Sequence, residues 1–274
     1  MSVVTRKIAL LKTQEYFNKI SSVSSDVKDK RSVFNFVEGI HDLGLWDSMV
    51  CWPLRSSQNA GVGNTAFSLG GLGTFDGTLI NNPSWSTTGM VTNGTTNQKI
   101  YVGDWNSVFG SAPVNNMSFG LVVVNGSAAM GHYQGASNGS EIGLQWTVDA
   151  TTPVGGVRNL WANWGYNWFN ELNFTNPSLG PAWVYSRRVS NTQAEFGLNN
   201  TVVFSKSDVN SGASAIPIAH IQNITPALLT NGRGDPNDAL SGTSSFYYMI
   251  KGEANNISLY NLYKSTLGKE LGLP

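Results

Sequence analysis

From Leu45 to the C-terminus, the sequence consists of short apolar runs separated by Gly, Asn, Ser and Pro. The clearest run is residues 141–149, where apolar and polar residues alternate as they do in a strand with one buried face. Its apolar face consists of Ile142, Leu144, Trp146 and Val148. Repeated runs of this length, bounded by turn-forming residues, predict an all-β fold.

Further runs predict the other strands. Residues 119–124 are continuously apolar and end at an Asn-Gly pair, which is typical of a buried strand followed by a tight turn. Residues 196–204 predict a hairpin around a central Asn-Asn pair, because asparagine tolerates the positive φ of a type I′ turn. Residues 246–250 and 257–259 predict closing strands. Residues 259–267 have helical spacing and predict a short C-terminal helix that stops at a glycine.

Composition narrows the functional classes. Hydrophobic residues make up 41% of the chain and charged residues only 12%, whereas an ordinary soluble domain is roughly a quarter charged. The 17 basic and 17 acidic residues cancel, so we expect no nucleic-acid binding, which needs a basic surface. No run reaches the roughly 18 to 20 apolar residues of a membrane span, so we expect none.

Compartment signals indicate a chain made in a reducing cytoplasm. Cys51 is the single cysteine, so no internal disulfide can form. The first apolar run, residues 8–11, is too short for a signal peptide. Polarity that comes from Asn, Ser, Thr and Gly rather than from charges is common in extracellular and viral β proteins. Because no export signal accompanies it, we expect release by cell lysis, as virion proteins are released.

Charge is concentrated at the N-terminus, where residues 1–45 hold 12 of the 34 charged residues. Two apolar clusters at helical spacing predict two short helices, with Ser24 or Ser25 as N-cap of the second. We therefore expect a helical segment, residues 1–45, followed by a β domain, residues 46–274. The helical segment either packs on its own domain or serves as an anchor or oligomerisation stem.

Residues 46–102 carry the most specific motifs. They run from Trp52-Pro53-Leu54 through a glycine-rich turn to Gly77-Thr78-Leu79-Ile80-Asn81-Asn82-Pro83-Ser84-Trp85, and end in Ile100-Tyr101-Val102. This order resembles the opening of laminin-G-like, concanavalin A-like jelly rolls, where Trp-Pro-Leu or Trp-Pro-Phe precedes a Gly-Thr-Leu-x-Asn-x-Pro-x-Trp segment. The resemblance implies that residues 46–274 form a jelly-roll β-sandwich.

Two further segments, residues 42–59 and 258–274, resemble structural proteins of marine tailed bacteriophages. This resemblance implies a virion component, such as a capsid decoration, a head fibre or a tail adhesin. Residues 1–45 would dock on other capsid or tail proteins. A homo-oligomer, such as a trimer, would suit a fibre or spike.

Glycoside hydrolysis needs two carboxyl groups roughly 5 to 9.5 Å apart. Hydrolases of the concanavalin A-like family typically place them as Glu-x-Asp-x-x-Glu, because alternate strand residues share a face. The seven glutamates of this chain are scattered, and none lies two residues from an aspartate. We therefore expect no catalytic residues and a non-enzymatic protein, with a glycan-cleaving enzyme as the alternative. Folding could still join Glu141 with Glu171.

Calcium is the one cofactor to consider. Laminin-G-like relatives often bind calcium at a loop rim, and the resemblance implies Asp76, Asp104 and Asp149 as candidate ligands. Calcium takes about six to eight oxygen ligands, and no single loop here supplies several carboxylates. The alternative is that these are solvated aspartates that stabilise turns.

The histidines and the cysteine offer no further site. His41, His132 and His220 are isolated from other metal ligands in the sequence. Cys51 lies in a strand-like run, which indicates a buried and inert thiol.

The aromatic segment 160–170 is the strongest candidate binding feature. Its aromatic residues alternate with asparagines, which puts flat apolar faces beside amide donors and acceptors. Sugars bind in this way, because their C–H faces stack on rings while amides contact their hydroxyls. A sandwich core or a subunit interface uses the same residue types, so both interpretations remain open. The candidate glycan-binding residues are Trp161, Asn163, Trp164, Tyr166, Asn167 and Trp168.

The sequence as a whole predicts a bacteriophage virion protein that displays a β-sandwich on the particle. The sandwich would stabilise the shell or adhere to host surface glycans. A dedicated receptor-binding tail adhesin is the closest alternative.

Overall fold

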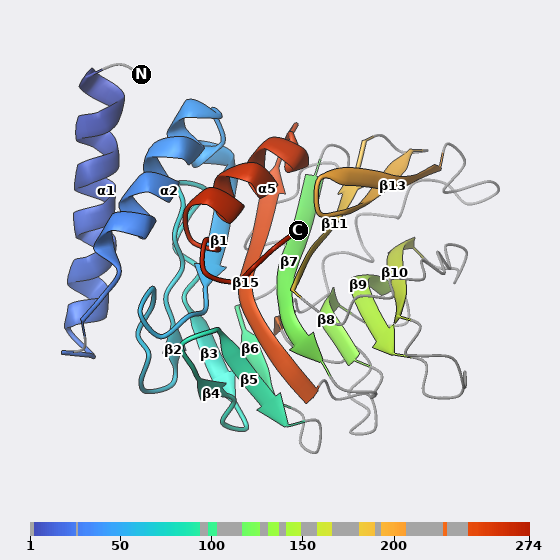
Figure 1. Ribbon diagram of the computed structural model, residues 1–274, viewed down its shortest axis with the longest axis horizontal. Helices are drawn as coiled ribbons and strands as arrows, with labels where there is room; N and C mark the ends of the chain where they lie inside the picture. The colour runs from blue at the N-terminus through green and yellow to red at the C-terminus, as the bar shows by residue number, and fades with distance from the viewer. Residues whose placement is uncertain are drawn as a thin grey trace.

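The computed structural model describes residues 3–25, 27–93, 98–102, 117–126, 131–136, 141–148, 158–165, 181–189, 193–206, 227–228 and 241–274. Two antiparallel sheets and a layer of helices make up this part of the chain (Figure 1). The helices lie against the larger sheet, beside its central strands.

The larger sheet has eight strands in the order β13-β12-β11-β7-β15-β5-β4, and β1 pairs with β15 off this path. Its strands are β1 (Met49–Pro53), β4 (Ser84–Trp85), β5 (Met90–Asn93), β7 (Met117–Gly126), β11 (Ala182–Arg188), β12 (Ala194–Leu198), β13 (Thr201–Lys206) and β15 (Ser241–Lys251).

The second sheet has seven strands in the order β10-β9-β8-β14-β6-β3-β2. Its strands are β2 (Thr65–Ala66), β3 (Gly77–Ile80), β6 (Lys99–Tyr101), β8 (Gly131–Ala136), β9 (Glu141–Val148), β10 (Arg158–Gly165) and β14 (Ala227–Leu228).

The expected all-β sandwich is confirmed, as are most of the predicted strands. The alternating run is β9, and the continuous apolar run lies within β7. The predicted hairpin is β12–β13, although Asn199 has a positive φ of 53° and Asn200 does not, so the turn is not type I′. The β12–β13 pairing also has a register shift between Phe196 and Gly197.

One predicted strand is wrong. Residues 257–259 begin a helix, α5 (Asn256–Ser265), rather than a closing strand. The Asn255 side chain accepts a hydrogen bond from the Ser258 backbone N–H at 3.0 Å and so caps this helix. The predicted C-terminal helix is thus confirmed but starts three residues earlier. The side chains of Leu259, Tyr260 and Tyr263 are buried, because helical spacing puts them on one face.

The two predicted N-terminal helices are α1 (Val3–Ser21) and α2 (Lys30–Asp42). Neither Ser24 nor Ser25 caps α2. Instead, Asp29 accepts a hydrogen bond from the Ser32 backbone N–H at 3.1 Å, because α2 begins later than expected. Among the residues described, we find no helix with the length and apolar character that crossing a membrane requires.

Strand β15 lies at the centre of the molecule and pairs with β1, β7 and β5. Its side chains alternate between two faces. Phe246, Tyr248 and Ile250 belong to one buried cluster together with residues of α1, α2 and α5. Phe36 of α2 meets the Phe246 ring edge-on at 5.5 Å, and Tyr263 of α5 lies 4.7 Å from it. The helices therefore share a hydrophobic core with the larger sheet.

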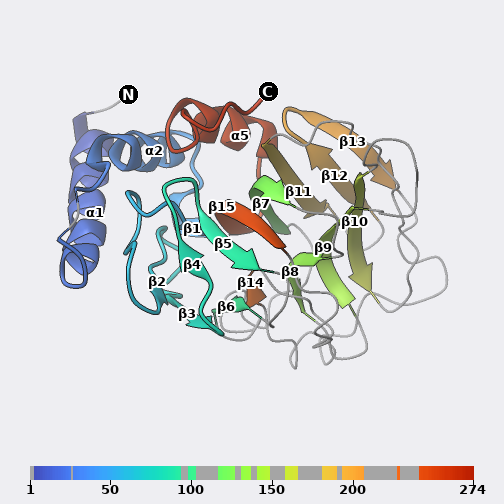
Figure 2. The same ribbon diagram turned by 60° about the horizontal axis from the view of Figure 1, so that its bottom comes forward.

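The helical layer extends from α1 at one edge of the molecule to α5 over the middle of the sheet (Figures 1 and 2). Ala9, Phe17 and Ile20 of α1 are buried in the shared core. Whether residues 1–45 also act as an anchor remains a prediction.

A buried polar segment, residues 55–59, joins the chain ends to the sandwich. Arg55 donates to the Thr87 and Leu267 carbonyls and to the Glu270 carboxylate. The Gln58 side-chain amide donates to the same Leu267 carbonyl at 2.9 Å. This segment belongs to the motif that resembles phage proteins, and its polar residues have a structural role.

Asn59 is fully buried and satisfies four backbone groups. Its amide nitrogen donates to the carbonyls of Pro53 and Phe67 at 2.7 and 2.9 Å. Its amide oxygen accepts from the backbone N–H groups of Ala60 and Phe67 at 2.7 and 2.9 Å. One side chain thus fixes the loop between β1 and β2.

We expect Asn59→Ala to lower the free energy of unfolding by about 3 kcal/mol or more, because buried donors and acceptors lose their partners. Urea denaturation followed by circular dichroism would measure this change. Asn64→Ala in the same loop is the control, since Asn64 is exposed. Equal stability of the two variants would contradict the role assigned to Asn59.

Candidate functional site

The predicted glycan-binding segment is only partly within the described residues. Trp161, Asn163 and Trp164 lie on β10 and pair with Gln145, Gly143 and Ile142 of β9. Whether these residues bind a glycan stays a prediction. Tyr166, Asn167 and Trp168 lie outside the described residues.

Of the predicted calcium ligands, only Asp76 is described, and Asp104 and Asp149 lie outside the described residues. One Asp76 carboxylate oxygen accepts hydrogen bonds from the Ser68 backbone N–H and hydroxyl at 2.8 and 3.0 Å. The other lies 3.9 Å from the Lys19 ammonium. The Asp76 side chain thus stabilises the loop between Ser68 and Asp76, in agreement with the alternative that it is a turn-stabilising aspartate. Within the described ranges, no three His, Cys, Asp or Glu side chains gather into a metal-binding group.

Cys51 is buried and His41 is half-buried beside the helical layer. Burial raises the pKa of the Cys51 thiol well above its ordinary value. His41 stacks on Trp46 with ring centroids 4.6 Å apart, and its buried Nε2 atom has no hydrogen-bond partner. Both therefore serve packing in this structure. The side chain of His132 and all of His220 lie outside what the structure describes.

A hollow of about 440 Å³ opens where the helical layer ends and the outer face of β11, β12 and β13 begins. We call it the sheet hollow. Its lining combines charged and amide side chains with apolar ones and comes from three parts of the chain: the end of α2, strands β11–β13 and the start of α5. The lining residues are Leu43, Leu45, Tyr185, Arg187, Glu195, Val202, Glu253, Ala254, Asn255, Asn256 and Ile257.

Arg187 and Glu195 are the central charges of the sheet hollow. They are register partners on β11 and β12, and an Arg187 amino group lies 3.5 Å from a Glu195 carboxylate oxygen. The Arg187 Nε atom is buried and has no hydrogen-bond partner. Burial, together with the nearby Glu195, raises the pKa of Tyr185 to about 12, so Tyr185 is a neutral phenol. The hollow thus offers an unused guanidinium donor beside a carboxylate.

Glycines shape the floor of the sheet hollow. Tyr185 lies between Gly120 of β7 and Gly197 of β12 in the strand register. A Cβ atom at Gly197 would fall 1.9 Å from the Tyr185 ring, so the ring lies over the glycine. The missing side chain lets the aromatic ring lie flat in the sheet surface.

The sequence did not reveal this hollow. Glu195 and Glu253 are far apart along the chain, and neither belongs to a catalytic spacing. The one local signal is the Arg187–Glu195 pair on neighbouring strands, but β11 was not predicted. The alternative that folding joins Glu141 with Glu171 remains untested, because Glu171 lies outside the described residues.

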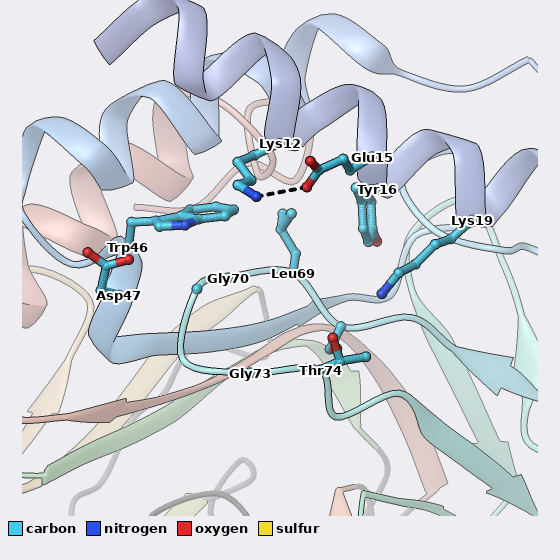
Figure 3. Close-up of a pocket in the computed structure, with 12 residues that line it drawn as sticks. Lys12, Glu15, Tyr16, Lys19, Trp46, Asp47, Leu69, Gly70, Gly73 and Thr74 are labelled. Atoms are coloured by element: carbon cyan, nitrogen blue, oxygen red, sulfur yellow. Dashed lines mark hydrogen bonds and ion pairs between the residues drawn. The ribbon is translucent and has the colours of Figure 1, made fainter. Parts of the chain in front are cut away.

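A second hollow, the helix groove, lies between α1 and the glycine-rich loop 68–74 (Figure 3). Lys12, Glu15 and Lys19 point from α1 toward this loop in Figure 3, and the Trp46 ring lies beside Lys12. Trp46 belongs to the short 3₁₀ helix η1 (Trp46–Ser48). The Lys12 ammonium donates to the Glu15 carboxylate at 2.9 Å.

No protein-family model and no curated protein matches the chain. A solved structure of Trypanosoma rangeli sialidase with 2,3-difluorosialic acid is similar at 10% identity and a TM-score of 0.53. This similarity covers 97% of the present chain and 39% of the sialidase chain. The present chain thus spans about two fifths of the sialidase.

Two further solved structures are similar over smaller parts of the chain. One is the CBM40 of a Ruminococcus gnavus sialidase bound to α2,3-sialyllactose (14% identity, TM-score 0.42, 59% of this chain and 92% of that chain). The other is tailspike protein 2 of Escherichia coli O157:H7 bacteriophage CAB120 (13% identity, TM-score 0.41, 63% of this chain and 24% of that chain). The described residues form a jelly-roll β-sandwich of two antiparallel sheets.

The similarity to the sialidase structure corrects the expectation of a non-enzymatic protein. Almost the whole of this chain has the same fold as part of a sialidase structure. The absence of Glu-x-Asp-x-x-Glu therefore does not separate this chain from enzymes, because the motif belongs to one way of placing carboxylates on the fold. In addition, the sheet hollow brings together Glu195 and Glu253, which no sequence spacing predicted.

His41 makes stability depend on pH. Burial lowers its pKa below the ordinary value of 6.5, with Lys12 adding to the shift and Asp47 and Asp42 opposing it. Below pH 6.5 the unfolded chain therefore binds more protons than the folded chain at this position. The corresponding stability is present above pH 6.5 and is lost as the pH falls through the lowered pKa.

We expect the melting temperature to fall between pH about 7.5 and about 5.5, and to fall less in His41→Phe, which keeps a ring against Trp46 without a titrating group. Differential scanning calorimetry of both proteins at matched ionic strength would measure this. Carboxylates titrate mainly at lower pH and are shared by both proteins. Parallel pH profiles would show that His41 does not cause the dependence.

Proposed function

We propose that the protein binds glycans in the sheet hollow. The observation that carries the proposal is the unused, buried Arg187 Nε–H donor beside the Glu195 carboxylate in a hollow of about 440 Å³. A sugar presents hydroxyls that donate and accept hydrogen bonds. A guanidinium and a carboxylate side by side satisfy both roles with charge-assisted bonds.

The apolar part of the hollow supports the same ligand class. Val202 and Ile257 line it together with Leu43 and Leu45 from the end of α2. Apolar side chains of this kind contact the C–H faces of a sugar ring while polar groups fix its orientation. Because Arg187 and Glu195 stand on paired strands, their positions are fixed by the sheet rather than by a loop.

A virion surface protein is the setting we propose for this binding. Two observations support it: the resemblance of residues 42–59 and 258–274 to phage structural proteins, and the surface of α1. Apolar side chains on α1 are 41–74% exposed, which a docking or oligomerisation surface would cover. These side chains are Val3, Val4, Ile8, Leu10 and Leu11.

Glycan cleavage is the second candidate function, and Glu195 and Glu253 favour it because both line the sheet hollow. Hydrolysis of a glycosidic bond uses one carboxylic acid to protonate the leaving oxygen and a second carboxylate to activate water or to attack. Tyr185 and Arg187 would then orient the sugar.

We expect Arg187→Ala and Glu195→Gln to weaken glycan binding by roughly tenfold or more, since each removes a charge-assisted hydrogen bond. A glycan array would select the oligosaccharide, and isothermal titration calorimetry would give its affinity. Lys251→Ala is the matched control, because Lys251 is exposed and outside the hollow. Unchanged affinity in both hollow variants would contradict this site.

The same oligosaccharide distinguishes binding from cleavage. Release of reducing ends by the wild-type protein, lost in both Glu195→Gln and Glu253→Gln, would establish the second candidate function. Binding without release of reducing ends would leave glycan binding alone.

We expect Val4→Lys together with Leu11→Lys to lower the oligomeric state or abolish incorporation into particles, because charges on the exposed face of α1 oppose apolar contact. Light scattering after size-exclusion chromatography would measure the mass. Val27→Lys is the control, since Val27 is 94% exposed outside α1. Deleting residues 1–44 is a poorer test, because it removes part of the shared core. An unchanged mass and unchanged incorporation would contradict the docking role.

A further inference from the structure

We infer that the helix groove is a second, separate binding site for an uncharged glycan chain. The inference shares its ligand class with the proposed function but uses other residues. No residue lines both the helix groove and the sheet hollow. The groove measures about 350 Å³ and is open along α1.

The helix groove is rich in unused hydrogen-bond donors. Among the described residues, the backbone N–H groups of Gly70, Gly73 and Thr74 have no hydrogen-bond acceptor, and neither does the indole N–H of Trp46. The neighbouring N–H groups of the loop are satisfied, since Gly71 donates to the Trp46 carbonyl and Leu72 to the Met49 carbonyl. Gly70 and Gly73 are half-buried and Thr74 is exposed, so these donors contact solvent, and the oxygen atoms of a ligand can replace that water.

Glycines keep the loop backbone accessible and close to Trp46. Gly70 has a φ of 131°, and a Cβ atom there would fall 2.1 Å from the Met49 carbonyl oxygen. A Cβ atom at Gly71 would fall 2.6 Å from the Trp46 indole ring. A side chain at either position would push the loop away. The loop is thus fixed with its main chain toward the groove, where a ligand can contact it directly.

Charges around the groove indicate an uncharged ligand. Lys12 is paired with Glu15 at 2.9 Å, and Lys19 with Asp76 at 3.9 Å. Asp47 adds one further negative charge to the lining. The net charge of these five groups is −1, so a phosphate, sulfate or uronate group would gain no net attraction. The hydroxyl groups of a neutral sugar instead donate to Glu15 or Asp47 and accept from Lys12 and Lys19.

The length of the groove suits more than one sugar ring. Lys12 and Lys19 are seven residues apart on α1, which corresponds to about 10 Å along the helix axis. Leu69 supplies apolar surface between these two polar positions, and the Trp46 ring lies beside Lys12 (Figure 3). The arrangement of apolar surface between polar ends matches a chain of linked sugars better than a single compact ligand.

A stoichiometry experiment tests the inference with the full chain. An array of neutral oligosaccharides of glucose, galactose, mannose and N-acetylglucosamine, two to six units long, selects the strongest binder. That oligosaccharide is then titrated into the wild type, Arg187→Ala, Asp47→Ala and the double variant. Hydrogen exchange of residues 12–19 and 68–75, with and without the oligosaccharide, reports on the groove itself. Circular dichroism spectra verify that each variant is folded.

We expect two equivalents to bind the wild type. In each single variant, one equivalent should keep its affinity while the other weakens roughly tenfold or more, and both should weaken in the double variant. Exchange in residues 68–75 should slow in Arg187→Ala and not in Asp47→Ala. Loss of all binding in Arg187→Ala would overturn the groove site and leave the proposed function standing. Binding that Asp47→Ala alone abolishes would support the groove and overturn the sheet hollow. No binding anywhere on the array would overturn the groove site.

Discussion

The structure depends on covering the aromatic face of β15. This strand is the hub of the larger sheet, and its Phe246, Tyr248 and Ile250 would face water if the sheet stood alone. Burial of one such side chain stabilises the folded state by about 1.5–3 kcal/mol. The cover comes from both ends of the chain, since α2 contributes Phe36 and α5 contributes Tyr263. The two chain ends therefore meet over the middle of the sandwich.

The candidate sites follow from the limited width of this cover. The helices cover β1, β15, part of β7 and Trp183 of β11, and the sheet continues beyond them into β12 and β13. The sheet hollow lies at the edge of this helical cover, where Arg187 and Glu195 lie beside the start of α5. At the opposite side of the layer, α1 meets the loop after β2, and the helix groove lies between them. Both hollows therefore lie at seams between helix and sheet.

The spacing of apolar residues was sufficient to predict the helices and strands in which that spacing is regular. Residues 141–148 alternate over a full strand, and residues 30–42 carry apolar side chains at helical spacing. Ile257 was assigned to the wrong element, because a short apolar run fits a strand as well as the first turn of a helix. The cap at Asn255 decides between the two. Neither hollow could be predicted, since each joins side chains that are distant in the sequence.

The fold class, the helices near both ends and the zero net charge follow from the sequence, because alternation, spacing and composition are local properties of the chain. The sequence also contains Arg55 and Asn59, but their hydrogen-bond partners could not be identified from it. That the N-terminal helices share a core with the sheet became clear from the folded structure alone. Only folding also brought Arg187, Glu195 and Glu253 to one hollow and Lys12, Trp46 and Gly73 to another. The physical reason is that strand register and helix docking, rather than sequence distance, set which side chains meet.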